Sequence, residues 1–225
     1  CAGAEAPAAY LLNIDGAIGP MTVHQLGRTL SLARQRNAEC VILVFDTPGG
    51  LLSSTRKAVK MILDSPVPVV GYVGPQGSQC ASAGTFLALA CHVVAMAPAT
   101  NIGAAHPVTL LGDSSDTTMQ QKALNDTVGF IKSIASLRKR NAEWAEKAVR
   151  ESASATAEEA LRLGVIDLVA KDMRELLRKV DGMTVETREG TRVLRTSGVA
   201  LREPRVGFRE RILSVISDPN IAYIL

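Results

Sequence analysis

Two apolar runs separated by one amphipathic stretch of helical length constrain the fold of this chain most strongly. Residues 41–45 are apolar throughout and residues 67–73 nearly so, which is typical of strands covered on both faces. Between them, residues 52–63 repeat apolar side chains with the period of a helix. A strand–helix–strand order of this kind indicates βαβ units, a parallel sheet and right-handed connections.

The same alternation continues along the chain and predicts an α/β fold, a mostly parallel sheet with flanking helices. We expect further strands at 11–14, 93–97 and 165–169, and helices at 20–36, from about 82, and at 118–140, 142–151, 156–163 and 172–180. Residues 105–117 are expected to form a long exposed loop, and loops of that length are often functional.

The character of the chain changes after Gly182, which predicts three parts. Residues 1–9 are expected to be a flexible lead-in, 10–182 the main folded domain, and 183–225 a small C-terminal appendage. In that appendage, 184–195 is predicted to be a hairpin and 207–217 a short helix. Its arginines and lysines are typical of a solvated surface, and a basic collar near lipid head groups is the alternative.

Composition excludes several classes of protein. Hydrophobic residues make up 47% and charged residues 21%, which is ordinary for a globular domain. A net charge of +3 is too small to indicate a nucleic-acid-binding protein. Four cysteines in 225 residues do not indicate a fold held together by disulfides. No apolar run approaches the ~20 residues of a membrane-spanning helix. The apolar end at 221–225 nevertheless suggests a chain that stops just before a membrane segment.

The first candidate for chemistry is the turn from Asp46 to Gly50, Asp-Thr-Pro-Gly-Gly, directly after a buried strand. Two glycines let the backbone approach a ligand closely, and N–H groups at a strand-to-helix turn can point at an anion. The turn lacks the spacing and the lysine of a nucleotide-binding loop. By itself it is more typical of a tight turn without function.

The second candidate is Ser82, in the segment Gln-Cys-Ala-Ser-Ala-Gly-Thr at 79–85. A serine at a helix start is often only an N-cap. A catalytic serine needs the same setting, an exposed hydroxyl with a backbone N–H beside it for an oxyanion. Ala83 would supply one N–H and the Gly50 turn another. Both turns follow successive strands, so we expect them side by side at the carboxyl ends of the sheet.

A nucleophilic serine needs a base, and one candidate is a histidine. His106 lies 24 residues after Ser82, at the start of the long loop. A triad that includes Asp113, Asp116 or Asp167 is conceivable.

The other candidate base is a lysine. Lys122 lies where the long loop meets the next predicted helix and could reach a site from its rim. Lys132 shares a helix face with Lys139, which favours solvent. A lysine base must be neutral, and burial beside apolar groups favours that form.

Six segments together resemble a known family: LNIDGAI at 12–18, FDTPGGL at 45–51, ASAGTF at 81–86, AMAPATNIGAAHP at 95–107, KALND at 122–126 and DPNIAY at 218–223. The chain is similar to the NfeD-like membrane-bound serine proteases, the stomatin operon partner proteases of the Clp-protease and crotonase superfamily. The resemblance implies a Clp-protease/crotonase-like fold.

The resemblance also implies the residues of a catalytic site. Its Ser-Lys dyad falls on Ser82 and Lys122, and its oxyanion donors on Gly49, Gly50 and Ala83. We favour Lys122 over a histidine base, because no aspartate is clearly placed to orient the histidine. No cofactor and no metal are expected.

The implied activity is that of an ATP-independent serine endopeptidase. It would cleave hydrophobic peptide segments, including those of a stomatin-like membrane protein, and Leu51 and Leu52 would pair with an extended substrate and form apolar subsites. A homodimer is expected, with the protease domain anchored to a membrane on its extracytoplasmic side through segments outside this chain.

Two other functions remain open at this point. A crotonase-like acyl-CoA enzyme would use the same paired N–H groups, but it needs a carboxylate in the pocket, and no glutamate lies in either glycine turn. The other is a non-catalytic scaffold that binds a stomatin-like protein.

Overall fold

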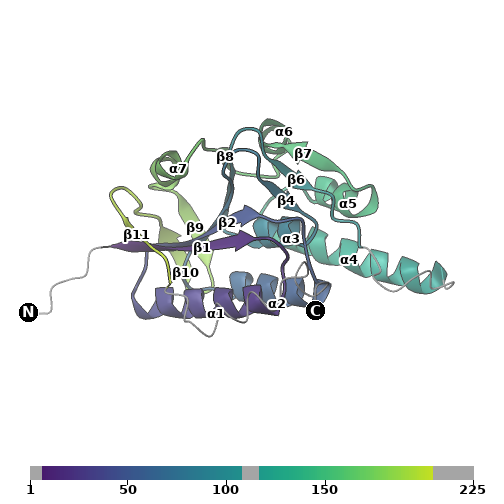
Figure 1. Ribbon diagram of the computed structural model, residues 1–225, viewed down its shortest axis with the longest axis horizontal. Helices are drawn as coiled ribbons and strands as arrows, with labels where there is room; N and C mark the ends of the chain where they lie inside the picture. The colour runs from purple at the N-terminus through teal and green to yellow at the C-terminus, as the bar shows by residue number, and fades with distance from the viewer. Residues whose placement is uncertain (1–6, 108–116, 205–225) are drawn as a thin grey trace, which may run out of the picture.

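The structure is a computed structural model that describes residues 7–107 and 117–204. Its centre is a six-stranded parallel sheet with the order β11-β1-β2-β3-β5-β8. The strands are β1 (Ala8–Asp15), β2 (Cys40–Asp46), β3 (Val69–Val73), β5 (Val93–Met96), β8 (Leu168–Val169) and β11 (Ala200–Arg202). This sheet, with helices on both sides, confirms the predicted α/β class (Figure 1).

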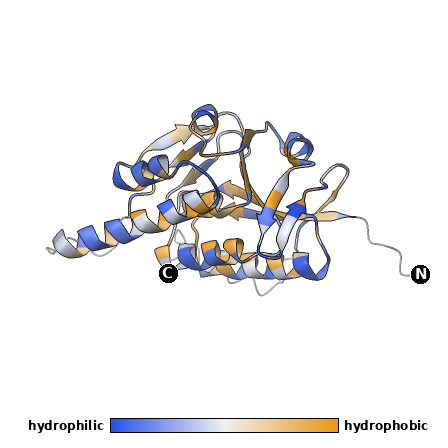
Figure 2. Cartoon of the chain, turned by 180° about the vertical axis from the view of Figure 1, so that it is seen from behind, coloured by the Kyte–Doolittle hydropathy of each residue, from blue (hydrophilic) through white to orange (hydrophobic). Residues whose placement is uncertain are grey.

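The two faces of the sheet carry separate apolar cores, which explains the continuous apolar strands. In β2, Val41, Leu43 and Phe45 face one core, whereas Cys40 and Ile42 face the other, as the two-residue period of a strand requires. The first core lies beneath α1 (Pro20–Gln35), α2 (Leu52–Leu63) and α3 (Ala83–Ala90). The second is covered by α7 (Met173–Val180) and the hairpin of β9 (Thr184–Thr187) and β10 (Gly190–Val193). Figure 2 shows the hydrophobic residues concentrated in these strands.

A small second sheet lies beyond the carboxyl end of the large one and holds the candidate serine. It consists of β4 (Gln79–Ala81), β6 (Asn101–Gly103) and β7 (Ser154–Thr156). Packed around it are α4 (Thr117–Leu137), α5 (Ala142–Arg150) and α6 (Ala157–Arg162). The first turns of α4 project away from the body of the domain (Figure 1), and residues 118–123 are exposed.

The helices predicted within the described residues and the longer strands occur, with ends that differ by a few residues. The sequence did not predict β4, β6 and β7, nor β11, which joins the segment after Gly182 to the main sheet through parallel pairing with β1. The helix expected at 207–217 and most of the loop expected at 105–117 lie outside the described residues. Among the helices of the described ranges, none combines the length and apolarity needed to cross a membrane.

Candidate active site

The Asp46–Gly50 turn and the strand that leads to Ser82 are hydrogen-bonded to each other. The Thr47 N–H donates to the Gln79 carbonyl at 2.8 Å, and the Ala81 N–H donates to the Thr47 carbonyl at 3.0 Å. These two bonds extend the parallel pairing of β2 into β4. The glycine turn and the candidate serine therefore lie side by side, as the strand order predicts.

Ser82 adopts a backbone conformation that is rare outside glycine. Its φ is 51° and its ψ is −118° at the step from β4 into α3, and a conformation of this kind costs on the order of 1–3 kcal/mol. Two bonds hold it: the Ser82 N–H donates to the Gly103 carbonyl at 2.9 Å, and the Thr85 N–H donates to the Ser82 carbonyl at 3.1 Å. The side chain makes no N-capping bond, and in the described residues its hydroxyl has no hydrogen-bond partner. The hydroxyl is therefore available for chemistry.

Gly49 faces Ser82 directly. A Cβ at this position would lie 2.5 Å from Ser82 Cβ and 2.9 Å from Ser82 Oγ, and the φ of Gly49 is +125°. Gly50 is equally constrained, because a Cβ there would lie 2.1 Å from the Ile18 carbonyl oxygen. Both glycines are required by close approach of the backbone.

Two backbone N–H groups beside Ser82 are free to bind an oxyanion. Ala83 is the first residue of α3, and first-turn amides have no partner inside a helix. The Gly50 N–H makes no hydrogen bond within the described ranges. The Gly49 N–H, in contrast, donates to Thr47 Oγ1 at 3.1 Å. Of the three predicted donors, the geometry leaves Gly50 and Ala83 available and shows Gly49 engaged. The positive end of the α3 dipole adds to the attraction for an anion.

Cys80 lies two residues before the serine but is no competing nucleophile. It is fully buried, and burial raises the pKa of its thiol well above the ordinary value. A buried neutral thiol of this kind behaves as a small hydrophobic side chain.

Lys122 lies on the helix that packs against α3, but it does not contact Ser82. Phe130 of α4 stacks on Phe86 of α3 with ring centroids 5.6 Å apart. One turn nearer the start of α4, Asp126 pairs with Arg56 of α2 at 2.5 Å. Lys122 lies a further turn back on the same side of the helix. Its side chain is exposed and has no hydrogen bond or ion pair within the described residues, so the dry surroundings expected for this lysine are absent here.

The structure separates the histidine alternative from one of its proposed aspartates. His106 is exposed, and its Nδ1 lies 2.9 Å from the Val149 carbonyl oxygen. Asp167 accepts a bond from Arg140 at 2.7 Å and one from the Val94 N–H at 2.6 Å. These contacts place Asp167 at the far end of α3 from Ser82, so it does not orient His106. Asp113 and Asp116 lie outside the described residues.

The two leucines predicted as subsites follow Gly50 immediately and are accessible. Leu51 is 45% exposed and Leu52 43% exposed. They offer apolar contacts to a peptide bound at the glycine turn.

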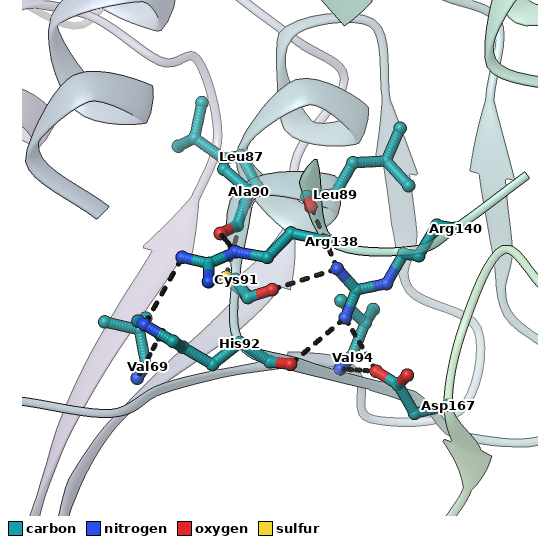
Figure 3. Close-up of polar contacts among 10 residues, drawn as sticks. All are labelled: Val69, Leu87, Leu89, Ala90, Cys91, His92, Val94, Arg138, Arg140 and Asp167. Carbon is teal, nitrogen blue, oxygen red and sulfur yellow. Dashed lines mark hydrogen bonds and ion pairs between the residues drawn. The ribbon is translucent and has the colours of Figure 1, made fainter. Parts of the chain in front are cut away.

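A buried polar cluster closes the opposite end of α3. In Figure 3, two arginines reach the last carbonyls of the helix: Arg138 Nε donates to Ala90 O at 2.8 Å, and Arg140 Nη1 donates to Leu89 O and to Cys91 O, each at 3.0 Å. Cations at this end complement the helix dipole. Sequence reasoning missed this cluster, because residues 138–140 come from a segment distant in the chain.

A family comparison decides what kind of domain this is. Residues 8–188 match the sequence model of a protein family, the NfeD1b N-terminal domain. The chain belongs to this family. The NfeD1b-type domain is 40% identical over 221 residues to the membrane-bound protease PH1510 of Pyrococcus horikoshii, covering 96% of the chain and 50% of that protein. It is 32% identical over 119 residues to the membrane protein NfeD1b of Bacillus subtilis, covering 53% of the chain and 26% of that protein.

Solved structures agree with this assignment. The NfeD1b-type domain is similar to a serine-to-alanine mutant of the 1510-N membrane-bound stomatin-specific protease, with a TM-score of 0.82 and 38% identity over 90% of this chain and 100% of that one. It is also similar to a lysine-to-alanine mutant in complex with a substrate peptide, with a TM-score of 0.85 and 37% identity over 95% and 99% of the two chains. These matches confirm the predicted family resemblance and fold. The chain spans about half the length of PH1510.

Proposed function

We propose that this domain is an ATP-independent serine endopeptidase with Ser82 as nucleophile and Lys122 as general base. The observation that carries the proposal is the position of the Ser82 hydroxyl beside the N–H groups of Gly50 and Ala83, all three without a hydrogen-bond partner among residues 7–107 and 117–204. Similarity to a stomatin-specific protease of 38% identity supports it. A strained residue at the step from a strand into a helix is a common way to present a nucleophile.

The reaction would proceed by acyl transfer. The Ser82 oxygen attacks the scissile carbonyl carbon while its proton passes to the neutral amine of Lys122. The carbonyl oxygen becomes an oxyanion that accepts bonds from the two N–H groups. The C–N bond then breaks, Lys122 gives the proton to the leaving amine, and water hydrolyses the acyl-serine by the same steps.

Lys122 must come closer to Ser82 than it lies in the free domain. Catalytic contacts are often long in unliganded enzymes and shorten in the substrate complex. An apolar peptide over Leu51 and Leu52 would exclude water from this rim, and a desolvated ammonium loses its proton more readily. The place of Lys122 on α4, the helix that packs against α3, supports this role.

The proposed substrate is an apolar segment of a membrane-associated protein, such as a stomatin-like partner. Support comes from the two exposed leucines and from the stomatin-specific relative with a bound substrate peptide. We further propose a homodimer and attachment to the extracytoplasmic side of a membrane through segments outside this chain.

Cleavage of an apolar peptide by four proteins tests the dyad. We expect Ser82→Ala and Lys122→Ala each to lose about 10³-fold or more in kcat, as for other nucleophiles and bases that act as a unit. His106→Ala is expected to keep activity within about 3-fold of the wild type, since it lacks a described aspartate partner. Full activity of Lys122→Ala together with an inactive His106→Ala would assign the base to the histidine instead. Tight binding of an acyl-CoA without peptide cleavage would favour the crotonase-like alternative.

A further inference from the structure

Thr47 is a buried threonine in the centre of the site whose hydroxyl the mechanism above does not use. It is completely buried, and its side chain bonds to both neighbouring segments. Thr47 Oγ1 donates to the Gly16 carbonyl at 2.6 Å and accepts from the Gly49 N–H at 3.1 Å. The Gly49 carbonyl lies farther away, at 3.3 Å, and a hydroxyl has only one hydrogen to donate.

The Thr47 hydroxyl and the Ile18 N–H together fix the orientation of two successive peptide units in the glycine turn. The Gly49 N–H points inward to Thr47, while the Gly49 carbonyl accepts from the Ile18 N–H at 2.7 Å. In a trans peptide the carbonyl and the next N–H point in opposite directions. The Gly50 N–H must therefore point away from Ile18, which leaves it free for the oxyanion. Two consecutive glycines could otherwise rotate this peptide at low cost.

The same residue also holds the nucleophile. The backbone of Thr47 brackets β4 through bonds to Gln79 and Ala81, and Ser82 follows β4 directly. Its methyl group packs against the first turn of α3, where a Cβ at Gly84 would lie 2.7 Å from Thr47 Cγ2. One residue thus links both oxyanion donors to the serine.

We propose that Thr47 is a positioning residue of the catalytic site, whose hydroxyl anchors the Pro48–Gly49 peptide of the turn that presents the Gly50 N–H to the oxyanion. The inference rests on the proposed protease function and deepens it. Thr47 touches no substrate. It acts through the turn, so its loss should weaken the transition state more than the bound peptide.

Thr47→Val removes the hydroxyl and keeps the shape, and Thr47→Ser keeps the hydroxyl. Removal of one oxyanion donor typically costs about 10²–10³ in kcat, so a displaced donor should cost about 10- to 100-fold in Thr47→Val with KM changed less than about 3-fold. Thr47→Ser should stay within about 3-fold of the wild type. The matched control is Thr29→Val in α1, another buried threonine, whose hydroxyl bonds only to Gln25 O at 2.8 Å within its own helix. This control should retain wild-type kinetics.

A second readout separates positioning from a general loss of structure. A peptide aldehyde forms a hemiacetal when the Ser82 oxygen adds to its carbonyl carbon and the serine proton moves to the base. Thr47→Val should weaken binding of the aldehyde by the same factor as kcat. In a Ser82→Ala background, Thr47→Val should leave the affinity for the uncleaved peptide unchanged.

The outcomes distinguish this inference from the function on which it rests. A wild-type protein without cleavage or aldehyde binding would overturn both. Wild-type cleavage with unchanged kcat in Thr47→Val, or an equal fall in Thr29→Val, would overturn only the role of Thr47. Should Thr47→Val fail to unfold cooperatively, Thr47→Cys takes its place under the same criteria, because a thiol fills the site and is a weak acceptor.

Discussion

A side chain at Gly49 would collide with Ser82, because its Cβ would lie 2.5 Å from the Cβ of the serine. This relationship joins two motifs that are 33 positions apart in the sequence. A glycine is required at position 49 because Ser82 occupies the space that a side chain would fill. The positive φ of Ser82, 51°, is accommodated because Gly49 has no side chain there. The two features therefore form one structural unit rather than a turn and an N-cap.

Replacement of Gly49 by alanine is the first prediction. We expect Gly49→Ala to lower kcat for peptide cleavage about 10²-fold or more, because the new Cβ meets Ser82. The free energy of unfolding should fall by about 2–4 kcal/mol, because this contact is added to the strain of a φ of +125°. Gly164→Ala is the control, since its φ is also positive, at +68°, but open space surrounds it. Urea unfolding and kcat measure the two effects. Wild-type activity in Gly49→Ala would contradict the described contact.

The second prediction concerns the docking of α4. Phe130→Ala should lower the free energy of unfolding by about 2–3 kcal/mol, because it removes the stack on Phe86 and the ring beneath Arg56, whose guanidinium carbon lies 4.4 Å from the ring centre. Cleavage should fall as well, because Lys122 lies on this helix. Leu137→Ala, which truncates an exposed side chain at the last residue of α4, should change neither property. A destabilised Phe130→Ala with undiminished kcat would argue against α4 as the carrier of the base.

The third prediction is a loss of stability in acid that depends on His92. Burial first, and then the neighbouring Arg138 cation, lower the pKa of His92 from 6.5 to about 3. Between these two pH values the unfolded chain binds a proton that the folded chain does not, so stability falls as the pH falls. From about pH 7 to about pH 4.5 the contribution of this histidine should shrink by on the order of 2 kcal/mol.

His92→Asn provides the comparison, because an asparagine oxygen can replace Nδ1 as the acceptor for the Val69 N–H, a contact of 3.0 Å. Urea unfolding at the two pH values should show a smaller decline for the variant than for the wild type. Identical declines would show that His92 titrates normally in the folded protein.

The fourth prediction concerns the arginine pair at the end of α3. Arg140→Met should lower the free energy of unfolding by about 3–5 kcal/mol, because it leaves Asp167 and the helix carbonyls without their buried partner. The side chain of Arg140 is only 3% exposed. Arg34→Met, which breaks an exposed pair with Glu189, should cost less than about 1 kcal/mol. An equal fall in the free energy of unfolding for the two variants would contradict the burial of Arg140 in its ion pair with Asp167.

The sequence was sufficient to predict five of the six strands of the large sheet but not all of the site. Strands such as β2 are long, apolar and separated by helices of regular period, so local patterns define them. β4, β6 and β11 have three residues each, and they exist only through pairing with distant partners. The role of Thr47 was missed for the same reason, since its hydroxyl bonds to Gly16, which lies 31 positions away.

Ser82 and Lys122 illustrate the same limit. Their motifs identify them, and the turn around Ser82 has a geometry suited to a nucleophile. Lys122 depends on the placement of α4 relative to α3, a packing relationship that residue types alone do not define. In the free domain it is exposed. The substrate-bound state is where its role has to be tested.

The most direct test of the account is the site at which a fluorophosphonate modifies the protein, located by tandem mass spectrometry. We predict one modified residue, Ser82, with no labelling in Ser82→Ala and much slower labelling in Lys122→Ala. Labelling of another residue, or a protein that cleaves apolar peptides while Ser82 remains unmodified, would contradict it.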